Sequence, residues 1–165
     1  MNIAFTLNGT ETVVDAKPDE KLIDVLRKNH IYSVKNGCGC GRCGSCTVLL
    51  DGKPVKSCLI PVGIIMNSKI QTLESFEKED IYKDIVKGFK QAGVQLCGYC
   101  NSSKFFSVYD FIKKISRPTQ EQLQEFIDDI FDACNCTERE TLMTGVLYAA
   151  ALKLEREGKK KNAAK

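Results

Sequence analysis

The first 75 residues alternate short apolar runs with turn residues, a pattern that predicts a small mixed β-sheet with one helix. Ile3, Phe5 and Leu7 alternate with polar or small residues as in a strand, and the Asn-Gly dipeptide at positions 8–9 favours a tight hairpin. After Pro18, apolar residues recur with i, i+3, i+4 spacing, which predicts a short helix ending near Asn29. The other strands are expected around residues 13–14, 47–50, 54–60 and 70–73.

From residue 81 onward the apolar positions recur with the spacing of helices. Two helices are predicted at residues 81–91 and 105–115. Two more are expected to open with capping boxes, in which a Thr hydroxyl and a Glu or Gln side chain bond to backbone N–H groups of the first turn. The paired residues are Thr119 with Gln122, and Thr137 with Glu140.

This change of pattern predicts an α+β chain: a sheet domain at residues 1–76, a four-helix bundle at residues 77–157 and a basic tail at residues 158–165. The net charge of +3 arises near the end of the chain. Residues 153–165 carry six basic and two acidic side chains, a local excess of +4, which leaves −1 for the rest. Charge runs of this kind are usually solvated, so nucleic-acid binding is not expected.

Nine cysteines stand in a chain whose N-terminus lacks the basic and apolar segments of a secretory signal. No apolar stretch reaches the roughly 20 residues of a membrane span. We therefore expect a cytoplasmic protein without membrane insertion. Thiols are kept reduced in the cytoplasm, so cysteines at this density favour metal binding over disulfides.

Four cysteines follow the spacing C-x4-C-x2-C with a distant fourth, which is typical of plant-type 2Fe-2S ferredoxins. Gly39, Gly41 and Gly44 interleave with them and allow the loop to turn its backbone N–H groups toward a cluster. A four-thiolate zinc site is the alternative, although zinc usually prefers two C-x2-C-like pairs. The expected ligands are Cys38, Cys43, Cys46 and Cys58.

A second set of four cysteines forms a C-x2-C between the first two predicted helices and a C-x-C between the last two. Two interhelical loops at one end of a bundle can meet around one centre, so a second cluster and a zinc clip both fit. Cys40 lies in the first loop but outside its ligand spacing, and we interpret it as a spare thiol. The ligands of the second set are Cys97, Cys100, Cys134 and Cys136.

Together the two sets resemble the small iron–sulfur subunit of the molybdenum hydroxylases, the xanthine dehydrogenase and carbon monoxide dehydrogenase group. The similarity runs from about residue 2 to residue 150. The motifs that carry it are NGCGCGRCGSCTVLL at 36–50 followed by DGKPVKSCL, CGYC at 97–100 and CNCT at 134–137.

The resemblance implies a β-grasp ferredoxin domain and a four-helix bundle, each holding one 2Fe-2S cluster. It also implies an electron-transfer subunit of an oxidoreductase, with no substrate chemistry on this chain. A large molybdopterin subunit would oxidise the substrate. Electrons would then pass through the second set and the first set to a subunit that carries FAD.

Three departures from the family pattern lie around the second set. The family has Gln directly before the C-x2-C, where it contacts the pterin. Here Leu96 stands at that place, and Gln95, one residue earlier, is the candidate for the contact. Asn-Ser-Ser at 101–103 stands where Thr-Pro-Gly is usual, and Glu138 stands where Gly is usual after the C-x-C and its Thr.

One alternative is a ferredoxin-like carrier or subunit for another redox partner, with structural zinc in the second set. The helical half argues against a simple carrier, which needs only the first half. Metal content would separate the two cases: about four irons per chain for two clusters, against two irons and one zinc.

Overall fold

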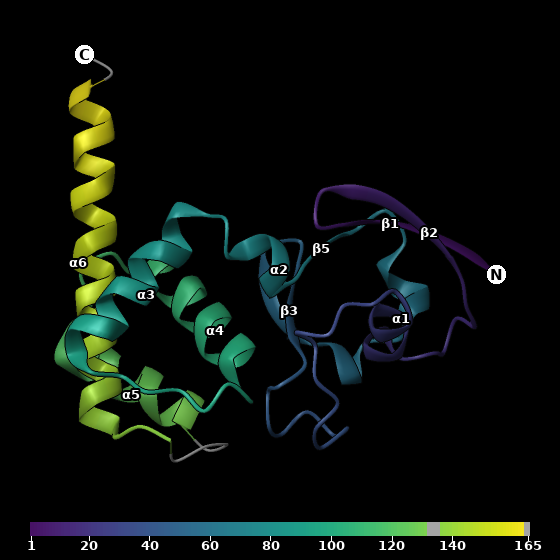
Figure 1. The fold of residues 1–165 in the computed structure, drawn as a ribbon, viewed down its shortest axis with the longest axis horizontal. Helices are drawn as coiled ribbons and strands as arrows, with labels where there is room; N and C mark the ends of the chain where they lie inside the picture. Colours follow the sequence, from purple (N-terminus) through teal and green to yellow (C-terminus); the bar gives the residue numbers. More distant parts are fainter. Residues whose placement is uncertain (132–135, 164–165) are drawn as a thin grey trace.

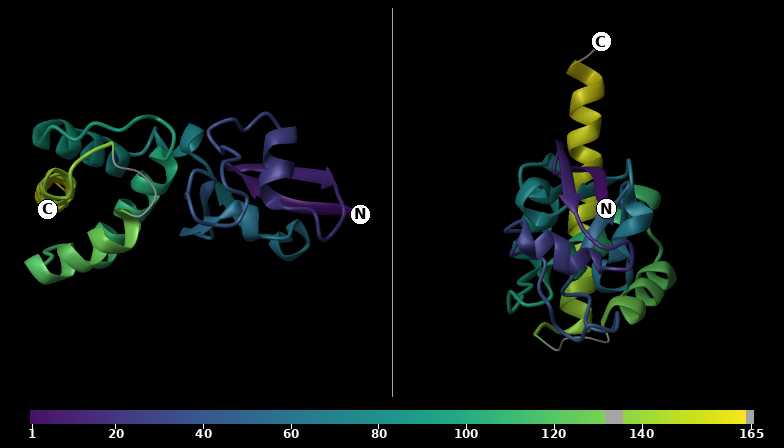
Figure 2. Two further views of the ribbon diagram at one scale, coloured as in Figure 1. Left: turned by 90° about the horizontal axis from the view of Figure 1, so that it is seen from below. Right: turned by 90° about the vertical axis from the view of Figure 1, so that its right-hand side faces the viewer.

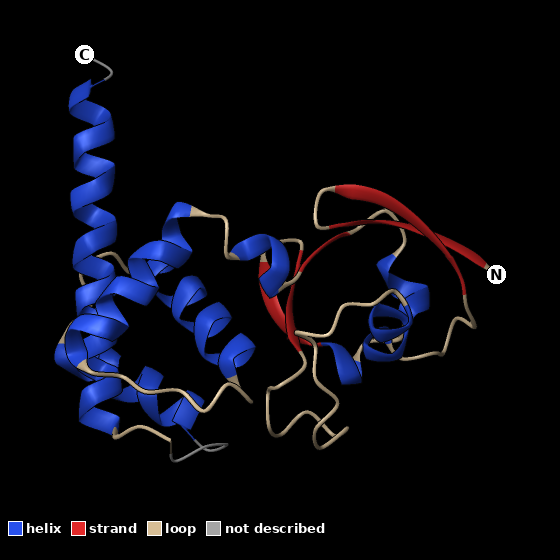
Figure 3. Ribbon diagram, in the orientation of Figure 1, coloured by secondary structure: helices blue, strands red, loops and turns tan. Residues whose placement is uncertain are grey.

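A computed structural model describes residues 1–131 and 136–163 of the chain and has a sheet domain beside a helical domain (Figures 1 and 3). The predicted α+β class is therefore confirmed. Within the described ranges, no helix is both long and apolar enough to cross a membrane.

The N-terminal half is a five-stranded mixed sheet in the order β2-β1-β5-β3-β4. β1 pairs antiparallel with β2 and parallel with β5, whereas β3 pairs antiparallel with β4 and β5. The helix α1 (Leu22–Lys28) contributes Ile23 and Leu26 to one core with Phe5 and Val48 of the sheet, as in a β-grasp domain. The strands are β1 (Asn2–Leu7), β2 (Thr10–Asp15), β3 (Thr47–Leu50), β4 (Lys53–Lys56) and β5 (Lys69–Gln71).

The strand predicted at residues 54–60 is wrong in its second half. β4 ends at Lys56, and the 3-10 turn η1 (Ser57–Leu59) follows. The backbone N–H and the hydroxyl of Ser57 both donate to the carbonyl of Cys46, at 3.2 and 2.7 Å, which bends the chain out of the sheet. This turn places Cys58 in the core beside Cys46.

The strand predicted at residues 70–73 also ends early, because the short helix α2 (Leu73–Phe76) begins there. Another 3-10 turn, η2 (Val62–Ile65), precedes β5. Phe76 is fully buried, and its ring centroid lies 5.0 Å from that of Phe106 and 5.2 Å from that of Tyr109 in the helical half. The end of α2 therefore packs with the helices, while the boundary after residue 76 stays a prediction.

In the described part of the chain four helices form the bundle, as predicted, and Figure 2 shows them gathered on one side of the sheet domain. Their apolar faces share one core that includes Ile85, Phe106, Leu123 and Val146, one from each helix. The helices are α3 (Asp80–Ala92), α4 (Asn101–Lys114), α5 (Gln120–Phe131) and α6 (Arg139–Ala163).

The capping box predicted at the start of α5 is confirmed. The N–H of Thr119 donates to Gln122 Oε1 at 3.0 Å, and the N–H of Gln122 donates to Thr119 Oγ1 at 3.3 Å. α6 begins one residue later than the capping box at Thr137 predicts. The carbonyl of Glu138 accepts its first helical hydrogen bond, from the N–H of Leu142.

Residues 158–163 of the predicted basic tail continue α6, which runs to Ala163 and projects beyond the rest of the bundle (Figure 1). Two ion pairs join α6 to α3. Arg156 Nε lies 2.7 Å from a carboxylate oxygen of Asp84, and Lys160 Nζ lies 2.8 Å from one of Asp80. Part of the basic charge is therefore used within the molecule.

Candidate metal centres

The first predicted ligand loop lies between α1 and β3 and folds back on itself. In this conformation the backbone N–H groups of Arg42 and Cys43 point at the sulfur of Cys38, with N···Sγ distances of 3.2 and 3.3 Å. Bonds of this kind offset the negative charge of a thiolate. The loop reverses at three glycines with left-handed backbones: Gly39 (φ 66°), Gly41 (φ 79°) and Gly44 (φ 67°).

The thiols of the first set lie in two neighbouring pairs. The N–H of Cys38 points at Cys43 Sγ at 3.5 Å, and that of Cys43 points back at Cys38 Sγ. The thiols of Cys46 and Cys58 are buried and within hydrogen-bond reach of each other. Two pairs of thiols match the donor set of a two-iron centre, in which four cysteines hold two irons.

The two pairs differ in their electrostatic surroundings. Backbone N–H groups, mainly those of Cys43 and Cys40, lower the pKa of the Cys38 thiol to about 6 and so favour its thiolate. Burial, aided by the neighbouring Cys46, raises the pKa of Cys58. A bound metal ion deprotonates a coordinating thiol outright, so the buried pair also fits a metal site.

Three thiols of the second set meet at one end of the bundle. The Sγ atoms of Cys97, Cys100 and Cys136 all lie within 4.8 Å of one another. Cys100 directly precedes α4, so the partial positive charge of that helix N-terminus lies beside the thiols. The predicted ligand Cys134 lies outside the described residues. The C-x2-C thus meets Cys136 of the C-x-C, which is a fitting donor set for an iron–sulfur cluster or for zinc.

The two thiol loops touch each other between the domains, where α4 packs against β3 and β4. The hydroxyl of Ser102 donates to the carbonyl of Ser45 at 3.0 Å in a buried contact. The ammonium of Lys35 donates to the carbonyl of Gly98, which lies between two ligands of the second set. We call these four residues the loop seam.

Gln95, the residue predicted to contact a pterin, is exposed in the segment between α3 and α4. Its neighbour Leu96 is half-buried against the helical core. Cys40 is exposed in the first loop. The pterin contact therefore stays a prediction, made by a side chain on the surface.

The sequence pointed to Ser102 only as part of a departure from the family pattern, and it did not point to Ser45 or Lys104. Serine takes part in no spacing pattern, so only the fold reveals Ser45 and Ser102 as partners. Lys104 is 1% exposed, and its Nζ donates to the carbonyl of Ile130 at 2.6 Å, near the end of α5. Lys104 stands among the buried apolar positions of α4, and that place in the sequence pattern could have identified it as a buried lysine.

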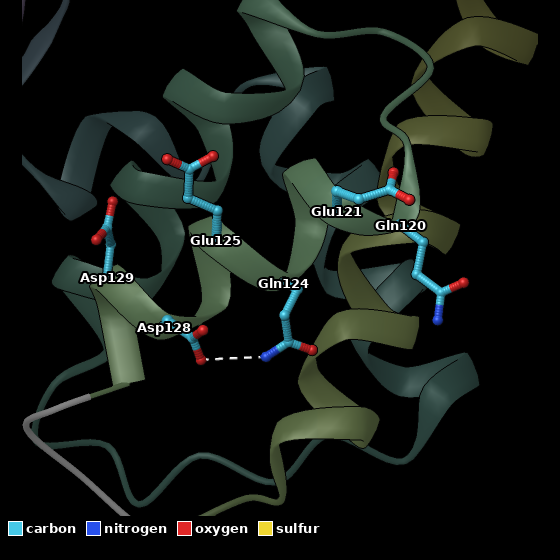
Figure 4. A pocket seen from close by; sticks show the side chains of 6 residues that line it. All are labelled: Gln120, Glu121, Gln124, Glu125, Asp128 and Asp129. Atoms are coloured by element: carbon cyan, nitrogen blue, oxygen red, sulfur yellow. Dashed lines mark hydrogen bonds between the residues drawn. The ribbon is translucent and has the colours of Figure 1, made fainter.

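A surface hollow along α5 carries acidic and amide side chains but no thiol (Figure 4). The amide of Gln124 donates to Asp128 Oδ1 at 3.1 Å, as Figure 4 shows. Charged helix faces are ordinarily solvated, and we assign no ligand to this one. The lining residues are Gln120, Glu121, Gln124, Glu125, Asp128 and Asp129.

A cysteine loop on a ferredoxin-like sheet and a second cysteine set on a helical bundle define a two-cluster iron–sulfur protein. The family profile of the 2Fe-2S iron–sulfur cluster binding domain matches residues 5–63, and that of the 2Fe-2S binding domain matches residues 72–147. The nicotinate dehydrogenase small FeS subunit of Eubacterium barkeri is 31% identical over 150 residues, which cover 90% of this chain and 94% of that protein. The chain belongs to the family of small iron–sulfur subunits of the molybdenum hydroxylases.

Other relatives agree with this assignment. The xanthine dehydrogenase iron–sulfur-binding subunit of Escherichia coli O157:H7 is 30% identical over 152 residues, covering 89% of this chain and 92% of that one. The crystal structure of quinoline 2-oxidoreductase from Pseudomonas putida 86 contains a chain that matches with a TM-score of 0.81 and 28% identity, over 96% of this chain and 97% of that one. The chain is therefore an electron-transfer subunit with two 2Fe-2S clusters, and structural zinc in the second set is not favoured.

Proposed function

We propose that the chain relays electrons from a molybdopterin subunit to a flavin subunit inside a molybdenum hydroxylase complex. Electrons enter at the second set (Cys97, Cys100, Cys134 and Cys136) and leave from the first set (Cys38, Cys43, Cys46 and Cys58). The observation that supports this best is the loop seam, because it joins the two ligand loops by direct hydrogen bonds.

The burial of the thiols supports a path that crosses the molecule between the two sets. Cys38 in the first set and Cys97 in the second are exposed, whereas Cys46 and Cys100 are buried. Each set therefore has one side open to a partner and one side inside the molecule. We infer that partner subunits dock at the exposed sides and that electrons cross the molecule between the buried sides.

The chain itself supplies ligands, hydrogen bonds and a fixed separation. When bound, the clusters supply one-electron redox chemistry, whose potential depends on hydrogen bonds to sulfur and on solvent exposure. The N–H groups around Cys38 and the N-terminus of α4 beside Cys100 each stabilise negative charge at their site. Substrate oxidation belongs to another chain in this proposal.

A related enzyme supports the proposal that this chain works together with partner subunits. The aldehyde oxidoreductase of Desulfovibrio desulfuricans ATCC 27774 matches with a TM-score of 0.80 and 30% identity over 93% of this chain, which corresponds to 17% of that protein. In that protein the equivalent segment is part of a much longer chain. We propose that separate subunits supply the remainder here, and that the complex is cytoplasmic, where eight ligand thiols stay reduced.

The test is to purify the tagged full chain anaerobically from its native host and to count metals and flavin in the complex. The proposal expects molybdenum and flavin to copurify with about four irons per chain, two for each cluster. A matched purification from an untagged strain controls for background metal. A complex with four irons per chain but no molybdenum would contradict the proposed partner and leave the two clusters standing.

A further inference from the structure

Ser45 is connected to two ligands of the first loop: it directly precedes Cys46, and its side chain contacts Cys43. Its side chain is fully buried, and its hydroxyl lies 3.1 Å from the sulfur of Cys43 while it donates to the carbonyl of Lys35, also at 3.1 Å. Its carbonyl carbon is bonded to the nitrogen of the next residue, Cys46. The backbone of Ser45 therefore leads directly into one ligand of the first set, Cys46, and its hydroxyl contacts another, Cys43.

Ser102 approaches from the other half of the molecule. It is 3% exposed, lies in the first turn of α4, and follows the ligand Cys100 by two residues. Its hydroxyl donates to the carbonyl of Ser45 at 3.0 Å. That carbonyl also accepts the N–H of Lys35 at 3.2 Å, so both of its lone pairs are used and its direction is fixed.

We propose that the Ser45–Ser102 hydrogen bond is the bridge through which electrons cross between the two ligand sets, with Ser102 as a positioning residue. This inference rests on the proposed function and adds the route that it uses. One electron leaves the second site, which is oxidised, and enters the first site, which is reduced. No bond is made or broken and no proton moves.

The other contact of the loop seam is a less direct route. Lys35 reaches the carbonyl of Gly98 through a long, flexible side chain, and its backbone lies three residues from Cys38. Ser103 packs against Gly44, where an added Cβ would lie 2.4 Å from the Oγ and 2.7 Å from the Cβ of Ser103. The serine bridge is a buried hydrogen bond, and it connects residues close to a ligand on both sides.

The test compares Ser102→Ala with Ser102→Thr, which keeps a hydroxyl, and with Ser103→Ala, which removes the neighbouring hydroxyl. Each full-length chain carries both clusters, an electron is injected by flash photoreduction, and its equilibration between the clusters is followed. We expect Ser102→Ala to keep the iron content and both EPR signals while equilibration slows several-fold. Ser102→Thr and Ser103→Ala should equilibrate at the rate of the unchanged chain.

The bridge is refuted if Ser102→Ala keeps both signals and equilibrates as fast as the unchanged chain. Should that variant lose a cluster, Ser102→Gly removes the same hydroxyl without a methyl group and is judged by the same two readouts. Loss of a cluster from both variants would also overturn the proposal, because the hydroxyl of Ser102 would then be needed to hold or assemble a cluster. If the unchanged chain shows only one EPR signal, the proposed function itself has failed.

Discussion

The close contact between α3 and α6 can be tested by replacing glycine with alanine at two positions, because the replacement should lower the stability of the protein at one and not at the other. Gly88 lies in α3 directly against the backbone of α6. A Cβ added there would lie 2.5 Å from the backbone nitrogen of Ala149 and 2.8 Å from the carbonyl oxygen of Gly145. Gly158 lies in the projecting part of α6 and has no neighbouring atom within 4 Å of such a Cβ.

The expected magnitudes follow from two terms. Replacing a helix glycine by alanine stabilises the helix by about 0.8–1 kcal/mol. Overpacking a core contact costs about 1–3 kcal/mol, and the cost at Gly88 lies at the upper end because the atoms met there are backbone. Gly88→Ala should therefore lose about 1–2 kcal/mol net, which is a fall in Tm of about 2–8 °C for a chain of this size.

The assay is thermal unfolding of the cluster-loaded chain, followed by circular dichroism and by the visible absorption of the clusters. Gly158→Ala should leave Tm unchanged or raise it slightly. In Gly88→Ala we expect the second cluster to bleach before the first, because α3 leads toward Cys97 and α6 starts near Cys136. An equal Tm for Gly88→Ala and the unchanged chain would refute the close helix contact.

Three further pairs of substitutions test the ligands, an ion pair and the packing of Gly44 against Ser103. Cys43→Ser should remove one EPR signal and leave the other. The control Cys40→Ser should keep both signals. Loss of both signals in Cys43→Ser would mean that the two halves do not bind their clusters independently. Arg156→Met should lower the free energy of unfolding by about 1–3 kcal/mol, because the nearly buried Asp84 loses its ion-pair partner. Lys159→Met, in the exposed pair with Glu155, should change the free energy of unfolding by at most about 1 kcal/mol. Equal losses in Arg156→Met and Lys159→Met would contradict the argument that the buried ion pair contributes more than the exposed one. Gly44→Ala should cost about 1–3 kcal/mol more than Gly9→Ala, since both have positive φ but, of the two, Gly44 has a close neighbour, Ser103. Denaturant unfolding that gives equal costs would contradict the close packing of Gly44 against Ser103.

Hydrophobic periodicity was enough to predict the class of the fold. The alternation in β1, the Asn8-Gly9 turn and the capping box at Thr119 are local signals, and the structure agrees with each of them. The error at residues 54–60 has a tertiary cause. Ser57 bonds to the carbonyl of Cys46, a residue on the far side of the hairpin, and no local pattern encodes that bond.

The cysteine sets could be identified from spacing, but the connection between them could not. The departure at residues 101–103 was visible in the sequence as a difference from the family. Only the fold places the hydroxyl of Ser102 on the carbonyl of Ser45, because those residues are 57 positions apart. That Cys97, Cys100 and Cys136 come together could be expected, because the order of the helices puts their two loops at one end of a bundle.

The central claim is that each half of the chain holds one 2Fe-2S cluster. It is tested most directly by low-temperature EPR of the dithionite-reduced full chain, purified anaerobically, with iron and zinc counted on the same sample. The account predicts two distinct 2Fe-2S signals and about four irons per chain, with no stoichiometric zinc. A single signal with two irons and one zinc would contradict it and would make the helical half a structural zinc domain.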